Sequence, residues 1–178
     1  AVNPRLILVS ISGFGQPDVQ AGPYTKMPAF DLIGQAMSGI AYTSGREGDP
    51  PSPVGFPLID TSVGDWAVTA TLLALYQRER TGLGQHLDVA MFDVGIHLNE
   101  YAVGAYGWHG VAPLRGRLPS SAPFELVRAS EGYVAIAVSG EAIFARFAEV
   151  IGHPELATDP RYANGTLRAS AMDDHLLP

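Results

Sequence analysis

The segment from Ser62 to Arg80 is apolar around almost its whole circumference. Apolar residues recur there at the 3.6-residue spacing of a helix, and others widen the stripe: Val63, Trp66, Ala67, Ala70, Leu72, Leu73, Ala74, Leu75 and Tyr76. Ser62, with Asp65 three residues later, predicts a capping box at its start, and Gly82 predicts its end. A helix with this pattern is expected to be largely buried, so the chain must fold around it and supply cover on nearly every side.

The composition is that of a folded protein. The chain has 178 residues, of which 47% are hydrophobic and 16% charged, so intrinsic disorder is excluded. A net charge of −7 argues against a nucleic-acid partner, which requires a basic face. Cysteine is absent, which removes disulfides, thiolate zinc sites and thiol nucleophiles. We find neither an uninterrupted apolar run of membrane-spanning length nor a secretory leader, and expect a cytoplasmic protein without a membrane partner.

The pattern of elements predicts an α/β protein with a change of architecture near its middle. The apolar run Leu6–Ile11 reads as a strand of a parallel sheet. The remaining expected elements are helices at 30–38, 62–80 and 90–106, an extended stretch at 86–89, a hairpin of 124–129 with 133–138, and a helix at 141–151. The glycines at 95 and 104 predict close packing of the 90–106 helix. We therefore divide the chain into residues 1–110, a linker at 111–122, and an α+β part at 123–178.

Two classes of site are disfavoured by the motifs. Gly13-Phe14-Gly15 follows a strand, but the third glycine of a dinucleotide fingerprint would fall at Asp18. The glycine turn still permits a close backbone approach to some other ligand. No G-x-S-x-G elbow occurs, and the five histidines lack ligand spacing, so neither a serine hydrolase nor a metal site is expected.

Asp60 is the carboxylate with the most informative position, because it stands just before the most apolar helix. It is either a helix cap or a nucleophile, since a helix N-terminus holds a carboxylate ionised. Asp31 and Glu141 also lie beside apolar residues, and each has a structural reading as a cap or a solvated side chain.

Several motifs, in order, resemble those of class III CoA-transferases. The residues that carry the resemblance are Asn3-Pro4-Arg5-Leu6-Ile7, Ser10-Ile11-Ser12-Gly13-Phe14-Gly15, Gly22-Pro23-Tyr24, Phe30 to Gly39, Glu79 to Val89, Ala122-Pro123-Phe124, Gly132 to Val138 and Gly152 to Tyr162. That family includes formyl-CoA:oxalate and carnitine CoA-transferases and α-methylacyl-CoA racemase. Its members are longer, so the resemblance implies a fragment that lacks the N-terminal part. It also implies the fold: the second part of a Rossmann-like large domain and most of a small α+β domain, from interlocked homodimers.

By this resemblance the chain transfers coenzyme A from an acyl-CoA donor to a carboxylic acid acceptor, with the thioester as substrate and no permanently bound cofactor. Asp60 matches the catalytic aspartate, which forms an aspartyl-CoA intermediate. The residues expected to bind CoA or substrate are Gly13, Phe14, Gly15, Pro28, Ala29, Phe30, Asp31, Ser120, Ser121 and Glu141.

Two alternatives remain. An acyl-CoA racemase of the same fold is disfavoured, because Phe30 stands where that branch has an acid–base histidine. The other alternative is a non-catalytic fragment that only assembles with the missing part. Residues 118–121 also lack the glycines of the oxalate enzymes, which argues against oxalate or formyl specificity.

Overall fold

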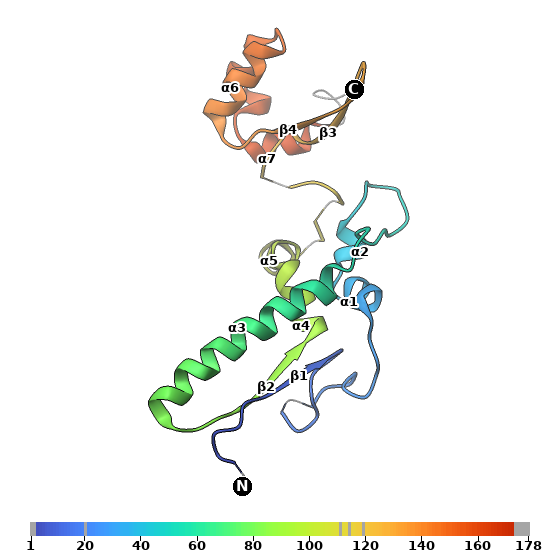
Figure 1. Cartoon of the computed structure of the whole chain (residues 1–178). Coiled ribbons are helices and arrows are strands. Elements are labelled where there is room, and N and C mark those ends of the chain that lie inside the picture. Colours follow the sequence, from blue (N-terminus) through green and yellow to red (C-terminus); the bar gives the residue numbers. More distant parts are fainter. Residues whose placement is uncertain (1–2, 20, 111, 114, 119, 173–178) are drawn as a thin grey trace. The chain divides into compact units, whose positions relative to one another are not determined.

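The computed structural model describes residues 3–19, 21–110, 112–113, 115–118 and 120–172 (Figure 1). The chain forms two compact units, Ala1–Gly110 and Val111–Pro178. The first contains a parallel pair of strands with helices, and the second an antiparallel hairpin with short helices. This mixed helix and strand architecture agrees with the α/β class predicted from the sequence.

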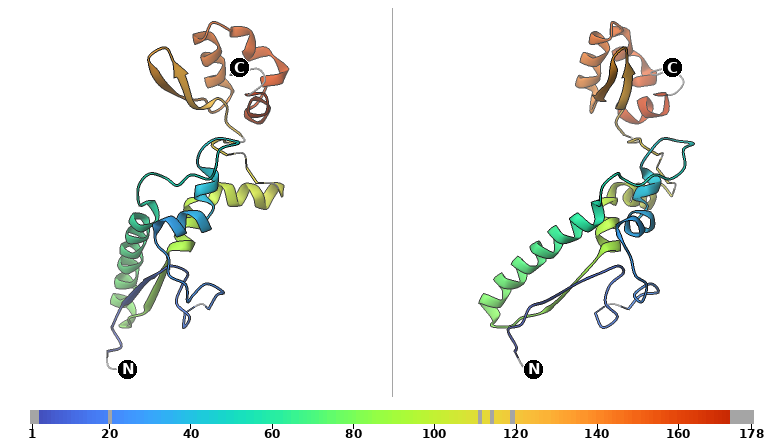
Figure 2. Two further views of the ribbon diagram at one scale, coloured as in Figure 1. Left: turned by 90° about the vertical axis from the view of Figure 1, so that its right-hand side faces the viewer. Right: turned by 45° about the vertical axis from the view of Figure 1, so that its right-hand side comes forward.

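The first unit is built on two parallel strands joined by a helical crossover. β1 (Leu8–Ser12) pairs with β2 (His86–Ala90), with Leu8 opposite His86 and Ser12 opposite Ala90. The crossover carries three helices: α1 (Asp31–Met37), α2 (Ile40–Thr43) and α3 (Leu58–Thr81). After β2 follow α4 (Met91–Leu98) and α5 (Glu100–His109). Helix α3 runs beside both strands (Figure 2), and its first turn packs near α4, which begins where β2 ends.

The core of this unit surrounds the start of α3. Its buried residues are Ile40, Ile59, Val63, Met91 and Val94. Glycines allow the close approach: a Cβ at Gly34 would lie 3.0 Å from the Ile59 side chain, and one at Gly95 only 2.7 Å from that of Ser38. The close packing predicted at Gly95 is thus confirmed. Gly104 differs, because a Cβ there would lie 3.9 Å from the Trp108 side chain of the same helix, which is an ordinary contact distance.

Two helix boundaries differ from the sequence prediction. Helix α3 begins at Leu58 with Pro57 at its N-cap, so the predicted capping box of Ser62 and Asp65 is wrong; its end before Gly82, with φ of 75°, is confirmed. The helix expected over 90–106 is two helices that meet at Asn99. The Asn99 side chain donates to the Ser38 carbonyl at 3.0 Å, which ties the junction of the two helices to the C-cap of α1.

The expected burial of α3 is not found within this chain. The exposed fractions of five large residues on it lie between 41% and 65%: Trp66, Val68, Leu72, Leu73 and Tyr76. By length and composition alone α3 is long and apolar enough to cross a membrane, although it contains no uninterrupted apolar run of that length. One such helix is weak evidence, because core helices of soluble proteins pass the same test.

The second unit packs short helices against a hairpin. β3 (Phe124–Ala129) and β4 (Gly132–Ala137) pair antiparallel, and Gly132 has the positive φ, 100°, that the tight turn needs. The helices that follow are α6 (Glu141–Val150), η1 (Pro154–Thr158), η2 (Pro160–Tyr162) and α7 (Gly165–Ser170). Val138, Phe144 and Tyr162 form its buried cluster.

A buried arginine holds this unit together. Arg168 is 1% exposed and donates to the carbonyl oxygens of Ala122 and Tyr162, each at 3.0 Å. Its guanidinium lies 4.5 Å from the centre of the Phe144 ring. Burial lowers the pKa of Arg168, and the carboxylate of Glu141, 4.0 Å away, opposes that shift.

We expect Arg168→Met to lower the free energy of unfolding by about 2 kcal/mol or more, because two buried carbonyls lose their donors. The measurement is urea denaturation of the intact protein. Arg146→Met is the matched control, because Arg146 is exposed on the neighbouring α6, and a change within about 0.5 kcal/mol is expected. Equal effects of the two substitutions would contradict the role given to Arg168.

Candidate active site

Asp60 lies in the first turn of α3 and is exposed to solvent. Counting from the N-cap Pro57, it is the third helical residue, and Ile59 before it is completely buried. Within the part of the chain that the structure describes, the Asp60 carboxylate makes no hydrogen bond and no ion pair. The structure thus presents a free carboxylate on a firmly anchored helical turn.

The cap of α3 comes from another helix. One carboxylate oxygen of Asp31, Oδ1, accepts hydrogen bonds from the backbone N–H of Ile59 at 2.7 Å and of Asp60 at 3.2 Å. Its second oxygen, Oδ2, accepts from the Gln35 side chain at 2.6 Å. Of the two readings left open for Asp60, the cap is therefore wrong, because Asp31 performs that function.

Gln35 connects this cap to the loop before α3. Its side chain is 1% exposed; Oε1 accepts from the backbone N–H of Val54 at 2.8 Å, and Nε2 also lies 3.4 Å from the Phe56 carbonyl. Sequence reasoning missed this residue. The available signal was its position four residues after Asp31 on a short helix, which places the two side chains on one face.

The other predicted residues of the first unit gather at the end of β1 and the start of α1. A Cβ at Gly13 would lie 2.7 Å from that of Ala29, and Gly15, with φ of 89°, donates to the Ser12 hydroxyl at 2.9 Å. The Phe14 ring packs between those of Tyr24 and Phe92, with centroids 5.5 and 5.9 Å away. Pro28 is exposed, and Phe30, the N-cap of α1, is 77% exposed. Carboxyl ends of parallel strands are the usual ligand edge of α/β sheets.

Ser120, Ser121 and Glu141 belong to the second unit. The Ser120 carbonyl oxygen packs against Gly165, where a side chain would collide with it. The backbone N–H of Ser121 donates to Leu118 at 3.4 Å, and Glu141 opens α6 with 67% of its side chain exposed. The structure places these residues within their own unit, and their relation to Asp60 stays a prediction.

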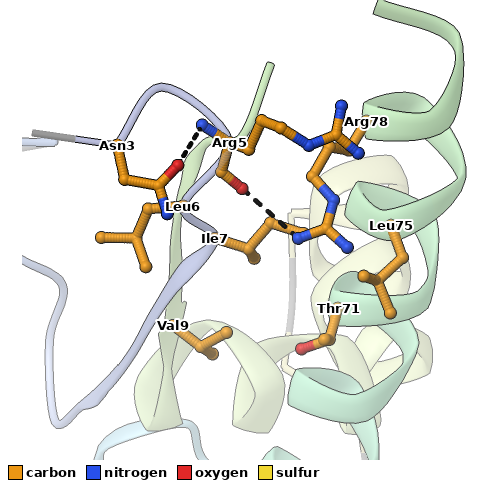
Figure 3. Close-up of a pocket in the computed structure, with 8 residues that line it drawn as sticks. All are labelled: Asn3, Arg5, Leu6, Ile7, Val9, Thr71, Leu75 and Arg78. Carbon is orange, nitrogen blue, oxygen red and sulfur yellow. Dashed lines mark hydrogen bonds between the residues drawn. The ribbon is translucent and has the colours of Figure 1, made fainter. Parts of the chain in front are cut away.

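A cavity of about 450 Å³ lies away from Asp60 (Figure 3). It opens between the start of β1 and the second half of α3, and Arg78 on its wall donates to the Arg5 carbonyl at 3.3 Å. Arg78 is eighteen residues beyond Asp60 on one helix, or roughly 27 Å at 1.5 Å per residue. The described residues contain no cluster of His, Asp and Glu suited to a metal ion.

The chemistry open to this arrangement is nucleophilic. A carboxylate fixed at its backbone and free at both oxygens can attack an electrophilic carbonyl, whereas a carboxylate already hydrogen-bonded is a weaker nucleophile.

Comparison with known proteins identifies the family of the chain. The family model for CoA-transferase family III matches residues 1–176. Acetyl-CoA:oxalate CoA-transferase of Acetobacter aceti is 41% identical over 175 residues, which are 97% of this chain and 44% of that protein. Succinyl-CoA–D-citramalate CoA-transferase of Chloroflexus aurantiacus is 36% identical over 98% of this chain and 44% of its own length.

The fold of the chain is also similar to that of a solved structure from this family. A CaiB/BaiF family protein from Brucella suis is 34% identical, with a TM-score of 0.72 over 95% of this chain and 44% of that one. The chain thus spans less than half the length of these relatives. With the family model matched along almost its entire length, the chain belongs to CoA-transferase family III.

Proposed function

We propose that this chain is the nucleophile-bearing part of a class III CoA-transferase. The enzyme moves coenzyme A from an acyl-CoA donor to a carboxylic acid acceptor, with Asp60 as the covalent catalyst. The observation that carries the proposal is the free carboxylate of Asp60 on a turn whose own amides are occupied by Asp31. Membership of CoA-transferase family III supports the reaction class.

The reaction balances without an external reductant, oxidant or metal. A carboxylate oxygen of Asp60 attacks the thioester carbonyl, the C–S bond breaks, and CoA leaves as a thiolate from a mixed anhydride. The thiolate then attacks the Asp60 carbonyl, which releases the donor acid and leaves an aspartyl-CoA thioester. The acceptor carboxylate repeats both steps in reverse order and regenerates Asp60. Division into several acyl transfers lowers each barrier.

We infer that the acceptor is a small dicarboxylic acid. Relatives at 33–41% identity are named for oxalate, D-citramalate, L-malate and glutarate as their acids. The lack of glycine at 118–121 was an argument against oxalate, yet the 41% identical relative is named for oxalate. The identity of the acceptor acid within this class stays a prediction.

Asp60→Asn should lower CoA transfer by about 10³-fold or more, because an amide cannot act as the nucleophile. Hydroxylamine added with acyl-CoA should form a hydroxamate at Asp60 alone, detected by peptide mass spectrometry. Asp65→Asn is the matched control, since Asp65 is also exposed on α3, and it should keep near-normal turnover. Retention of most activity in Asp60→Asn would refute the proposal.

Phe30 should prevent two-base racemisation, because a phenyl ring cannot carry a proton. With a 2-methylacyl-CoA in deuterated water, we expect deuterium to enter the α-carbon far more slowly than CoA is transferred. The measurement is NMR of the α-proton. Exchange that is faster than transfer would favour the racemase alternative instead.

We further propose that the intact protein is a homodimer. The exposed apolar side chains of α3, Leu72 and Leu73 among them, need cover that this chain does not supply. Light scattering of the intact protein at low micromolar concentration should give the mass of two chains. A stable monomer would contradict this part of the proposal.

A further inference from the structure

We propose that Pro57 and Asp31 are positioning residues that stop Asp60 from capping its own helix, so that both carboxylate oxygens stay free for the thioester. The inference rests on the proposed role of Asp60 as nucleophile. It explains why the Asp60 carboxylate has no hydrogen-bond partner among the described residues, although an aspartate in the first turn of a helix ordinarily has one.

An acidic side chain at the third residue of a helix commonly makes one particular hydrogen bond. In a capping box, an acidic side chain at this position reaches back to the backbone N–H of the N-cap residue. Asp60 occupies the third position, and its N-cap is Pro57, which has no N–H. The nearest local hydrogen bond open to the Asp60 carboxylate is therefore removed by the proline ring.

The remaining amides of the first turn are also occupied. The N–H of Leu58 donates to the Phe56 carbonyl at 2.8 Å, and that of Thr61 to the Pro57 carbonyl at 3.1 Å. Those of Ile59 and Asp60 donate to Asp31, at 2.7 and 3.2 Å. Each of the first four donors of α3 thus has an acceptor other than the Asp60 side chain, which satisfies the helix end without it.

The negative charge of Asp31 also helps to keep the Asp60 carboxylate reactive. A helix N-terminus carries a partial positive charge that stabilises a nearby carboxylate and makes it less reactive. Asp31 places a full negative charge on the same two amides, so less of this stabilisation is left for Asp60. Gln35 keeps Asp31 in place, because its amide orientation is fixed by Val54 on one side and Asp31 on the other.

The first test restores the missing N–H. In the intact enzyme, Pro57→Ala should slow formation of aspartyl-CoA about fivefold at saturating acyl-CoA, the strength of one capping bond. The KM for acyl-CoA and the thermal midpoint should change little. Pro51→Ala is the matched control: it also removes a loop proline but adds no donor at the start of α3, and it should leave the rate unchanged.

The second test removes the negative charge of Asp31 and then restores a negative charge at position 35. Asp31→Asn still offers Oδ1 to the two amides but turns an NH₂ group toward the Gln35 donor, so aspartyl-CoA formation should fall about tenfold or more. In Asp31→Asn/Gln35→Glu the new NH₂ group faces a carboxylate that also accepts from Val54. We expect this double variant to recover most of the lost rate, which is not expected of two independently harmful substitutions.

The outcomes separate this inference from the proposed function. If Asp60→Asn retains turnover, the function itself is wrong. If Asp60→Asn is inactive while Pro57→Ala behaves like Pro51→Ala, the positioning role of Pro57 is refuted and the nucleophile stands. Failure of the double variant to exceed Asp31→Asn, with both folded by circular dichroism, would refute the role of the cap.

Discussion

The carboxylate of Asp31 is the interaction on which the site depends. Its two oxygens join α1, which carries it, to the first turn of α3 and, through Gln35, to the loop at Val54 that precedes α3. Without it, two amides at the start of α3 would lack a protein acceptor beside the buried Ile59. One side chain therefore sets where α3 begins and, with it, where Asp60 stands.

The packing below this cap makes the arrangement rigid. Ile59 packs against Gly34 of α1 and Gly95 of α4, since a Cβ at these glycines would lie 3.0 and 3.3 Å from its side chain. Rigid support is required of a nucleophile, since misplacement by even about 1 Å can cost a hundredfold in rate. The exposed Asp60 is thus adjacent in sequence to the best anchored residue of the first unit.

The sequence predicts the elements with strong local patterns and misses those set by distant contacts. Strands β1 and β2, the hairpin of β3 and β4, and the end of α3 at Gly82 follow from hydrophobic runs and turn glycines. The start of α3 does not, because its cap lies 29 residues upstream at Asp31. Ser62 and Asp65 have the spacing of a capping box, but α3 begins before them, so they do not cap it. Likewise the apolar pattern of α3 indicates that cover is needed but not which segment supplies it.

If Asp60 is the nucleophile, as we propose, the cap also bears on how the acceptor acid is selected. Among the described residues, Asp31 is hydrogen-bonded to α3 through backbone amides, and Gln35 is hydrogen-bonded to the loop at the backbone of Val54 and Phe56. None of these contacts depends on the side chains that would line an acceptor pocket. On the proposed function, a change of acceptor acid would therefore require no change in how Asp60 is held. On this proposal the cap at the main chain of α3 sets the reactivity of Asp60, and selectivity is left to side chains elsewhere.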